Sequence, residues 1–179
     1  ALVRARDDIH FPEPLIRGGG QERGLRAGTE NVAGIAAFGA AAAVARRQGE
    51  AEAKRMRALR DQLEAGLWAV APSVVIFGAN AAERLPNTSL FAAAGMKAET
   101  AVIAFDLEGI AVSSGAACSS GKVQPSHVLA AMGVSAPLTR GAVRVSLGWT
   151  TTETDIERFL SAWRKLATAL SKGQAGMAA

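Results

Sequence analysis

The sequence has few of the residues that build several common kinds of site. Its single cysteine is Cys118, which excludes an internal disulfide, a C-x-x-C redox pair and a multi-cysteine zinc site. We therefore predict no metal centre. A chain without disulfides fits a reducing compartment, so we expect a cytoplasmic protein.

Aromatic residues are also scarce, at 5% of the chain, and tyrosine is absent. The chain is basic, with a formal net charge of +4 and a pI of about 9.8, which is compatible with an acidic partner. Its arginines are dispersed, however, and no aromatic residues interleave with a basic patch, as stacking platforms for single strands require. We therefore expect no nucleic-acid partner.

Long hydrophobic runs are missing as well. The uncharged stretch at residues 32–45 is mostly Ala and Gly and is too short to span a bilayer, and no secretory signal is visible. We predict no membrane segment. The chain begins without Met, and its opening residues read like the interior of something longer.

Two long helices are predicted from hydrophobic periodicity. The first covers residues 32–69, where apolar side chains recur at three- and four-residue steps, with Thr29 or Asn31 as its N-cap. The second starts at Thr152 and Asp155, a capping-box-like pair with Asp in place of Glu or Gln. Its apolar stripe consists of Ile156, Phe159, Leu160, Trp163, Leu166 and Leu170.

Shorter elements lie between these helices. Alternation and β-branched runs predict strands at 73–77, 87–92, 110–113 and 141–148, with helices at 98–107 and between Pro125 and Gly133. The fold class that follows is α/β, in which a long linking helix precedes an α+β small domain, a small sheet covered by helices.

The glycine-rich connection at residues 18–31 is the first candidate site. Its spacing matches neither the G-x-x-x-x-G-K-[ST] nor the G-x-G-x-x-G phosphate motif. A helix N-terminus nevertheless offers free N–H groups to a phosphate, and Thr29 adds a hydroxyl there. The residues alone leave two interpretations open, a phosphate contact or a helix cap after a flexible turn.

Arg144 is the second candidate. It lies between Val143 and Val145 in a predicted strand, so alternation directs it to the face opposite the two valines. A guanidinium on an otherwise apolar strand suits forked binding of a carboxylate. An exposed arginine on a sheet face is the alternative, and the residues do not decide between them.

The third candidate is Cys118, within "SSGAACSSG", residues 113–121. A buried structural cysteine usually has apolar neighbours, whereas these small residues leave the backbone permissive and the sulfur accessible. Reaction requires the thiolate. His127 lies downstream and is interpreted as structural, and no role can be argued for His10. A Cys–His hydrolase is disfavoured because nothing marks an acid partner or an oxyanion hole.

The motifs "GGGQERGLRAGTENV", "AVSSGAACSSG" followed by "PSHVLAAMG", and "AVRVSLGWTTTETDIERF" carry a resemblance over nearly the whole chain. In order and spacing they resemble the C-terminal half of cysteine desulfurases of the NifS/IscS type. These belong to the class V aminotransferase group of pyridoxal 5′-phosphate (PLP) enzymes, with fold type I.

The resemblance implies removal of sulfur from L-cysteine, giving L-alanine and a persulfide. PLP forms an adduct with the substrate amine and acts as electron sink. By resemblance, Cys118 is the nucleophile and persulfide carrier, and Arg144 binds the substrate carboxylate. Thr29 matches a threonine that reaches the cofactor phosphate of the opposite subunit in a homodimer. The persulfide then passes to a scaffold or acceptor protein, for iron–sulfur clusters or other sulfur compounds.

One departure from the family is large. The Schiff-base lysine of the family lies in an S-x-H-K motif, and none is present here. The resemblance therefore implies a fragment, inactive alone: the tail of the large domain and a glycine-rich connection (1–30), the linking helix (31–70), the small domain with its cysteine loop (71–172) and a flexible tail (173–179).

Two other function classes stay open at this point. In the first, the chain is a separate persulfide carrier, with Cys118 as sulfur acceptor and no catalysis. In the second, it belongs to an enzyme with another class V activity, such as an aminotransferase, selenocysteine lyase or epimerase. In the last group the cysteine is dispensable, so replacement of Cys118 separates it from a desulfurase.

Overall fold

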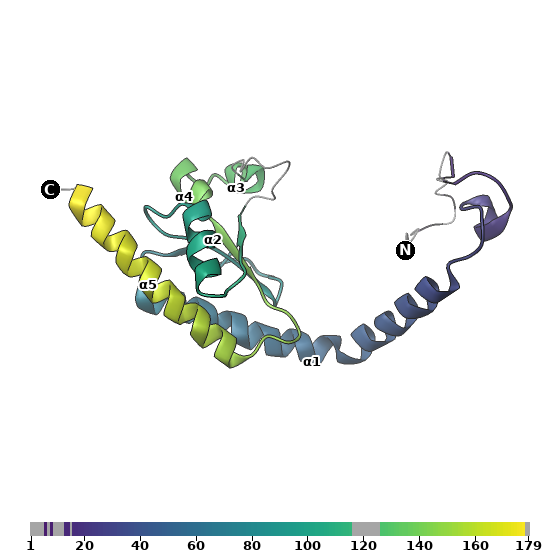
Figure 1. Cartoon of the computed structure of the whole chain (residues 1–179), viewed down its shortest axis with the longest axis horizontal. Helices are drawn as coiled ribbons and strands as arrows, with labels where there is room; N and C mark the ends of the chain where they lie inside the picture. Colours follow the sequence, from purple (N-terminus) through teal and green to yellow (C-terminus); the bar gives the residue numbers. More distant parts are fainter. Residues whose placement is uncertain (1–5, 7, 9–12, 15, 116–125, 178–179) are drawn as a thin grey trace. The chain divides into compact units, whose positions relative to one another are not determined.

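A computed structural model of the chain describes residues 6, 8, 13–14, 16–115 and 126–177, with side chains as far as residue 173. It contains two compact units, Ala1–Gly49 and Glu50–Ala179, and their boundary falls within the long helix α1 (Val32–Val70). The elements of the second unit that follow α1 are coloured along the sequence in Figure 1: β1 (Val75–Ile76), β2 (Thr88–Ala92), α2 (Ala98–Leu107), β3 (Ser113–Ser114), α3 (His127–Ala131), α4 (Ala136–Gly141), β4 (Val143–Ser146) and α5 (Glu153–Met177).

The first unit consists of the glycine-rich connection and the start of α1. The short 3₁₀ helix η1 (Gln21–Gly24) is followed by a parallel bridge between Ile16 and Arg26. Asn31 then caps α1, since its Oδ1 accepts a hydrogen bond from the amide of Gly34 at 3.0 Å. Of the two expected capping residues, Asn31 therefore has this role.

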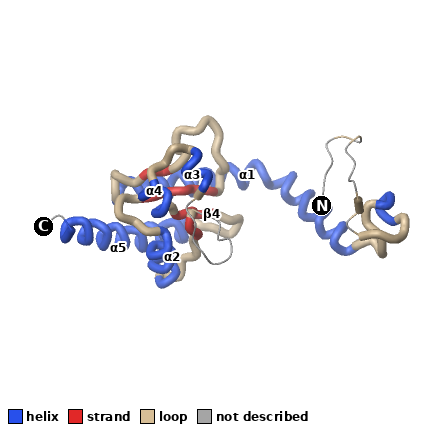
Figure 2. The backbone as a smooth tube through the Cα atoms, turned by 90° about the horizontal axis from the view of Figure 1, so that it is seen from above, coloured by secondary structure: helices blue, strands red, loops and turns tan. Residues whose placement is uncertain are grey.

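The second unit contains an antiparallel four-stranded sheet in the order β1-β2-β4-β3. In β4, Val143 and Val145 are buried while Arg144 and Ser146 are exposed, as alternation predicted. The strand β1 is shorter than expected, β3 overlaps its predicted range only at Ser113, and β4 has half of its predicted length. Figure 2 shows strand segments in red among the helices of this unit. The predicted fold class, a small sheet with helices, is confirmed.

Helices cover one face of this sheet and form the core with it. Phe91 of β2 contacts Trp163 and Phe159 of α5 edge-to-face, with ring centroids 5.4 and 6.3 Å apart. Phe159 in turn stacks on Phe105 of α2 at 4.7 Å. The end of α1 closes the core, where the indole of Trp163 donates to the carbonyl of Leu67 at 3.3 Å. Figure 1 shows α5 running beside this part of α1.

The last helix begins as the sequence predicts. The backbone and hydroxyl of Thr152 donate to the Asp155 carboxylate at 2.9 and 2.8 Å, and the amide of Asp155 donates back to Thr152 Oγ1 at 3.4 Å. The helix then continues to Met177, so the described part of the expected flexible tail is helical. Among the described residues, no helix combines the length and apolar character that a bilayer crossing needs.

Candidate active site

Arg144 lies on the open face of the sheet, at the centre of the candidate site. Its strand is held between β2 and β3, with Leu90 on one side and Ser113 on the other. The Arg144 side chain is exposed, and its guanidinium has no ion pair or hydrogen bond among the described residues. A fixed strand thus presents an exposed guanidinium, a group that suits an anionic ligand.

Several hydroxyl-bearing residues share the sheet face of this arginine. Directly paired residues of antiparallel strands share a face, so Thr88, Leu90, Ser113 and Ser146 lie on the same face as Arg144. Ser113 and Ser146 are exposed, and Thr88 and Leu90 are half-buried. The direct partners of Arg144 are therefore one hydroxyl residue, Ser113, and one apolar residue, Leu90, while Thr88 and Ser146 form a separate pair farther along the strands. A guanidinium beside a hydroxyl is suited to a small carboxylate ligand.

The strand β3 leads into the cysteine loop through a tight contact. The amide of Gly115 donates to the carbonyl of Ala142 at 2.6 Å. A Cβ at position 115 would lie 2.6 Å from the Cβ of Ala142, so a larger residue does not fit there. Cys118, the predicted nucleophile, lies outside the described residues, and its position relative to Arg144 stays a prediction.

Thr29, the predicted cofactor contact, belongs to the first unit. It is exposed, and its hydroxyl has no hydrogen bond among the described residues. Its carbonyl accepts a hydrogen bond from Arg26, while Asn31 caps α1. Because the cap is supplied by another residue, the Thr29 hydroxyl is available to a ligand, and its role at a phosphate stays a prediction.

The structure does not place the histidine His127 or the lysine Lys165 beside Arg144. His127 is the exposed first residue of α3, where the neighbouring Ser126 is the N-cap and accepts from the amide of Leu129 at 3.3 Å. The helix therefore begins after Pro125, which lies outside the described residues, as do His10 and Lys122. Lys165 is paired with Glu108 at 2.7 and 2.8 Å on the surface.

Sequence reasoning missed the role of Arg55, a residue of α1. Its guanidinium donates to the carbonyls of Thr151 at 2.6 Å and Trp149 at 2.8 Å, in the turn that follows β4. A hydrogen bond to Glu52 raises the pKa of Arg55 and lowers the pKa of Glu52. These contacts span more than 90 positions of the sequence, which no local pattern reveals.

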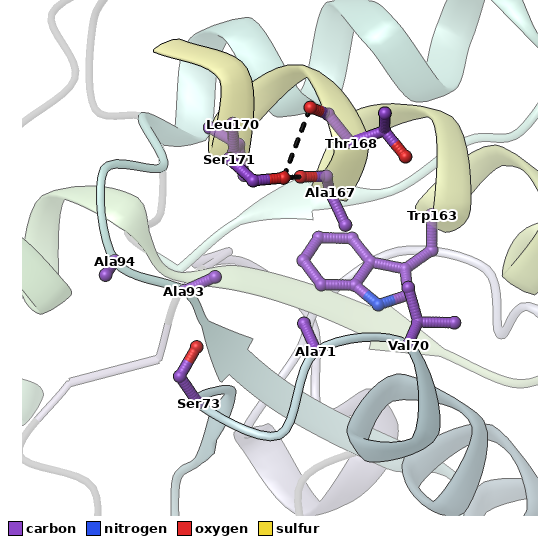
Figure 3. Close-up of a pocket in the computed structure, with 10 residues that line it drawn as sticks. All are labelled: Val70, Ala71, Ser73, Ala93, Ala94, Trp163, Ala167, Thr168, Leu170 and Ser171. Atoms are coloured by element: carbon purple, nitrogen blue, oxygen red, sulfur yellow. Dashed lines mark hydrogen bonds between the residues drawn. The ribbon is translucent and has the colours of Figure 1, made fainter. Parts of the chain in front are cut away.

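A cavity of about 280 Å³ lies away from these residues, between α5 and the loops beside β1 and β2 (Figure 3). The Trp163 indole forms one wall, and the Ser171 hydroxyl donates to carbonyls of its own helix, Ala167 at 2.8 Å and Thr168 at 3.2 Å. Its lining has no charged group, so it lacks an acid, a base or an ion-binding residue. None of the predicted site residues lines it; the lining consists of Val70, Ala71, Ser73, Ala93, Ala94, Trp163, Ala167, Thr168, Leu170 and Ser171.

Comparison with known proteins gives consistent similarities. The aminotransferase class-V family matches residues 15–159. The cysteine desulfurase of Gluconacetobacter diazotrophicus is 47% identical over 147 residues, which is 82% of this chain and 36% of the relative. The cysteine desulfurase NifS of Azotobacter vinelandii is 46% identical, with the same shares covered.

A solved structure agrees with these relatives. The NifS-like protein of Rickettsia africae superposes with a TM-score of 0.74 at 38% identity, over 87% of this chain and 40% of that one. The chain thus spans between a third and a half of the length of the proteins that it matches. The family match at residues 15–159 includes β4, the strand that bears Arg144, and ends within the first turns of α5.

Proposed function

Since this chain belongs to the class-V aminotransferase family, as its motifs predicted, we propose that it is the C-terminal part of a cysteine desulfurase. The observation that carries the proposal is the exposed Arg144, which has no ion pair within the described part of the chain and lies beside the strand that leads to Cys118. Curated cysteine desulfurases at 46–47% identity support the same reaction. The substrate is L-cysteine, and the products are L-alanine and a persulfide.

In this proposal Arg144 binds the substrate carboxylate through a forked, charge-assisted contact. The Cys118 thiolate forms a bond to the substrate sulfur. The carbon–sulfur bond of the substrate breaks, its electron pair stays with the carbon fragment, and that fragment takes a proton to become alanine. The sulfur remains on Cys118 as a persulfide. The proposal requires Cys118 to reach both substrate and acceptor, and Gly, Ser and Ala neighbours in the sequence are compatible with this requirement.

Enzymes of this family generally depend on PLP, which when bound supplies an electron sink for the substrate. This chain supplies only some of the residues that would hold the cofactor. The Thr29 hydroxyl, which is exposed and has no hydrogen bond to any residue that the structure describes, suits a phosphate. In the homodimer that the resemblance implies, this hydroxyl reaches the cofactor of the opposite subunit. No S-x-H-K lysine is present in the sequence, so the covalent anchor of the cofactor must come from outside these 179 residues.

A persulfide carrier is the second candidate, and its supporting observation is the single cysteine, Cys118, among small residues in the sequence. Such a module accepts sulfur on Cys118 from another enzyme and delivers it to an acceptor protein. The 179-residue chain is treated with a low-molecular-weight persulfide, and sulfane sulfur is measured by cyanolysis and by peptide mass. Sulfur on Cys118 supports this role, and its absence contradicts it.

The desulfurase proposal is tested in a hybrid enzyme, in which this chain replaces the segment that it matches in the Azotobacter vinelandii relative. We expect the PLP-loaded hybrid to convert L-cysteine to L-alanine and sulfide when a thiol reductant is present. Cys118→Ser is expected to abolish this activity. A hybrid that turns over an amino acid equally well with Cys118→Ser would instead indicate another class V chemistry.

A further inference from the structure

We propose that Ser113 is a second carboxylate-binding residue, which acts with Arg144 to select substrates that have a free α-carboxylate. The inference rests on the proposed function, because it concerns the same substrate. Ser113 is the first residue of β3, and Cys118 follows it by five positions in the sequence. A carboxylate held between Ser113 and Arg144 therefore lies beside the strand that leads to the nucleophile.

The register of the sheet carries this assignment. Ser113 is the direct partner of Arg144 on β3, and Leu90 is its direct partner on β2. Directly opposed residues have Cβ atoms about 4.5–5.5 Å apart and share a face. Arg144 thus has the Ser113 hydroxyl on one side and the apolar Leu90 on the other. Of these two neighbours, only Ser113 can donate a hydrogen bond to a ligand that is bound by the guanidinium.

Both groups are accessible to a ligand. Ser113 and Arg144 are exposed, and among the described residues neither side chain has a hydrogen bond or an ion pair. A carboxylate bound by a guanidinium in a forked geometry uses two lone pairs and retains about two more. The Ser113 hydroxyl can donate to one of them, which adds a hydrogen bond to a charged acceptor.

Other hydroxyls on this face lie farther from the arginine. Ser146 is two positions along β4, roughly 7 Å away, and Thr88 is a diagonal neighbour at about 7–8 Å. Ser146 is exposed like Ser113 and has the same side chain, so it provides a matched control for the loss of one hydroxyl from this surface.

The test compares L-cysteine with L-cysteinamide, which lacks the carboxylate, in the PLP-loaded hybrid enzyme. For Ser113→Ala we expect KM for L-cysteine to rise about tenfold with kcat little changed, and kinetics with the amide to stay the same. The preference for L-cysteine therefore falls about tenfold. Ser113→Thr, which retains a hydroxyl, is expected to restore it, and Ser146→Ala is expected to leave it unchanged.

Three results would overturn the inference. One is an unchanged preference in Ser113→Ala, and another is equal losses with both substrates, which would indicate a structural role. The third is loss of preference in Ser146→Ala in place of Ser113→Ala. In all three the hybrid still releases alanine, so the proposed function survives. A hybrid that releases no alanine overturns the proposed function and this inference together.

Discussion

At the scale of single residues, the root of the cysteine loop depends on the absence of a side chain at Gly115. A Cβ there would lie 2.6 Å from the Ala142 Cβ and 3.1 Å from the Ala142 carbonyl oxygen. Ala142 is fully buried and immediately precedes β4, so it has little freedom to move away. The contact between Gly115 and Ala142 therefore lies both at the start of the cysteine loop and next to the strand that carries Arg144.

We predict that Gly115→Ala destabilises the protein by about 1–3 kcal/mol, because it overpacks this contact. Equilibrium urea denaturation followed by circular dichroism measures the change. Gly39→Ala is the matched control: a Cβ at this helical position meets open space, so the substitution is expected to stabilise α1 slightly. Equal stability changes for the two variants would contradict a steric requirement at Gly115.

At the scale of elements, the start of α5 depends on its capping residues. The backbone amide of Thr152 and, secondarily, its hydroxyl donate to the Asp155 carboxylate and lower the pKa of Asp155 below its ordinary value of 3.8. A carboxyl whose pKa is lower in the folded state contributes stability above its unfolded pKa. That contribution is lost as the pH falls from about 3.8 through the folded value.

We therefore predict that Asp155→Asn lowers the melting temperature at neutral pH, and that the difference from the parent disappears on acidification below the folded pKa of Asp155. Thermal melts between neutral and acidic pH measure this dependence. Asp106→Asn serves as control, because the Asp106 carboxylate has no ion pair among the described residues. A constant difference between parent and Asp155→Asn at every pH would argue against the assigned cap.

A second element-scale contact joins α1 to the loop before β2. Glu64 is buried on α1, and its carboxylate accepts from Arg84 at 2.9 Å and from the Ser89 hydroxyl at 2.7 Å. The hydrogen bond to Glu64 raises the pKa of Arg84. The Glu64 carboxylate thus connects α1, the loop before β2 and β2 itself through hydrogen bonds.

We predict that Arg84→Met destabilises the protein by about 3 kcal/mol, because it leaves the Glu64 carboxylate buried without its cation. The double variant Arg84→Met with Glu64→Leu is expected to recover part of this loss, since an apolar pair leaves no unpaired charge. A denaturation double-mutant cycle measures the coupling. Additive losses would mean that the two side chains do not interact energetically.

Elements with a strong local signal were predictable from the sequence. The helices α1 and α2 begin at the expected residues, and α5 begins at its predicted cap, because periodicity and capping act within a few positions. The strands β1 and β3 are shorter than expected, since their extent depends on the strand that pairs with them. The six-residue helix α4 was missed, being too short for a periodic pattern.

The candidate site was likewise predictable only where the signal is local. Alternation placed Arg144 on the exposed face, but only the register reveals Ser113 as its neighbour. The contacts of Arg55 with the turn after β4 were likewise invisible, because they depend on the tertiary fold. Local signals identify the reactive residues, and long-range pairing decides which side chains surround them.

At the scale of the whole molecule, the first half of α1 exposes large apolar side chains. Ile35 and Phe38 are each 59% exposed and Val32 is 69% exposed, at three-residue steps along the helix. Exposed apolar surface of this kind favours association. In the longer relatives, more than half of the protein lies beyond the matched segment.

We predict that the isolated 179-residue chain self-associates or aggregates through this surface. Size-exclusion chromatography with light scattering measures its mass over a range of concentrations. The double variant Ile35→Lys with Phe38→Glu is expected to shift the equilibrium toward monomer, whereas Ile103→Lys, a similarly exposed residue on α2, is expected to have less effect. A parent chain that is monodisperse, monomeric and cooperatively melting would contradict the prediction.

The central claim is that sulfur from L-cysteine passes through Cys118. The most direct measurement is mass spectrometry of the PLP-loaded hybrid enzyme, quenched during turnover of L-cysteine with thiol-blocking reagent and without reductant. We predict that the peptide containing Cys118 gains the mass of one sulfur atom, and that this mass is removed by a reductant. Turnover to alanine with Cys118 never carrying additional sulfur would contradict the claim.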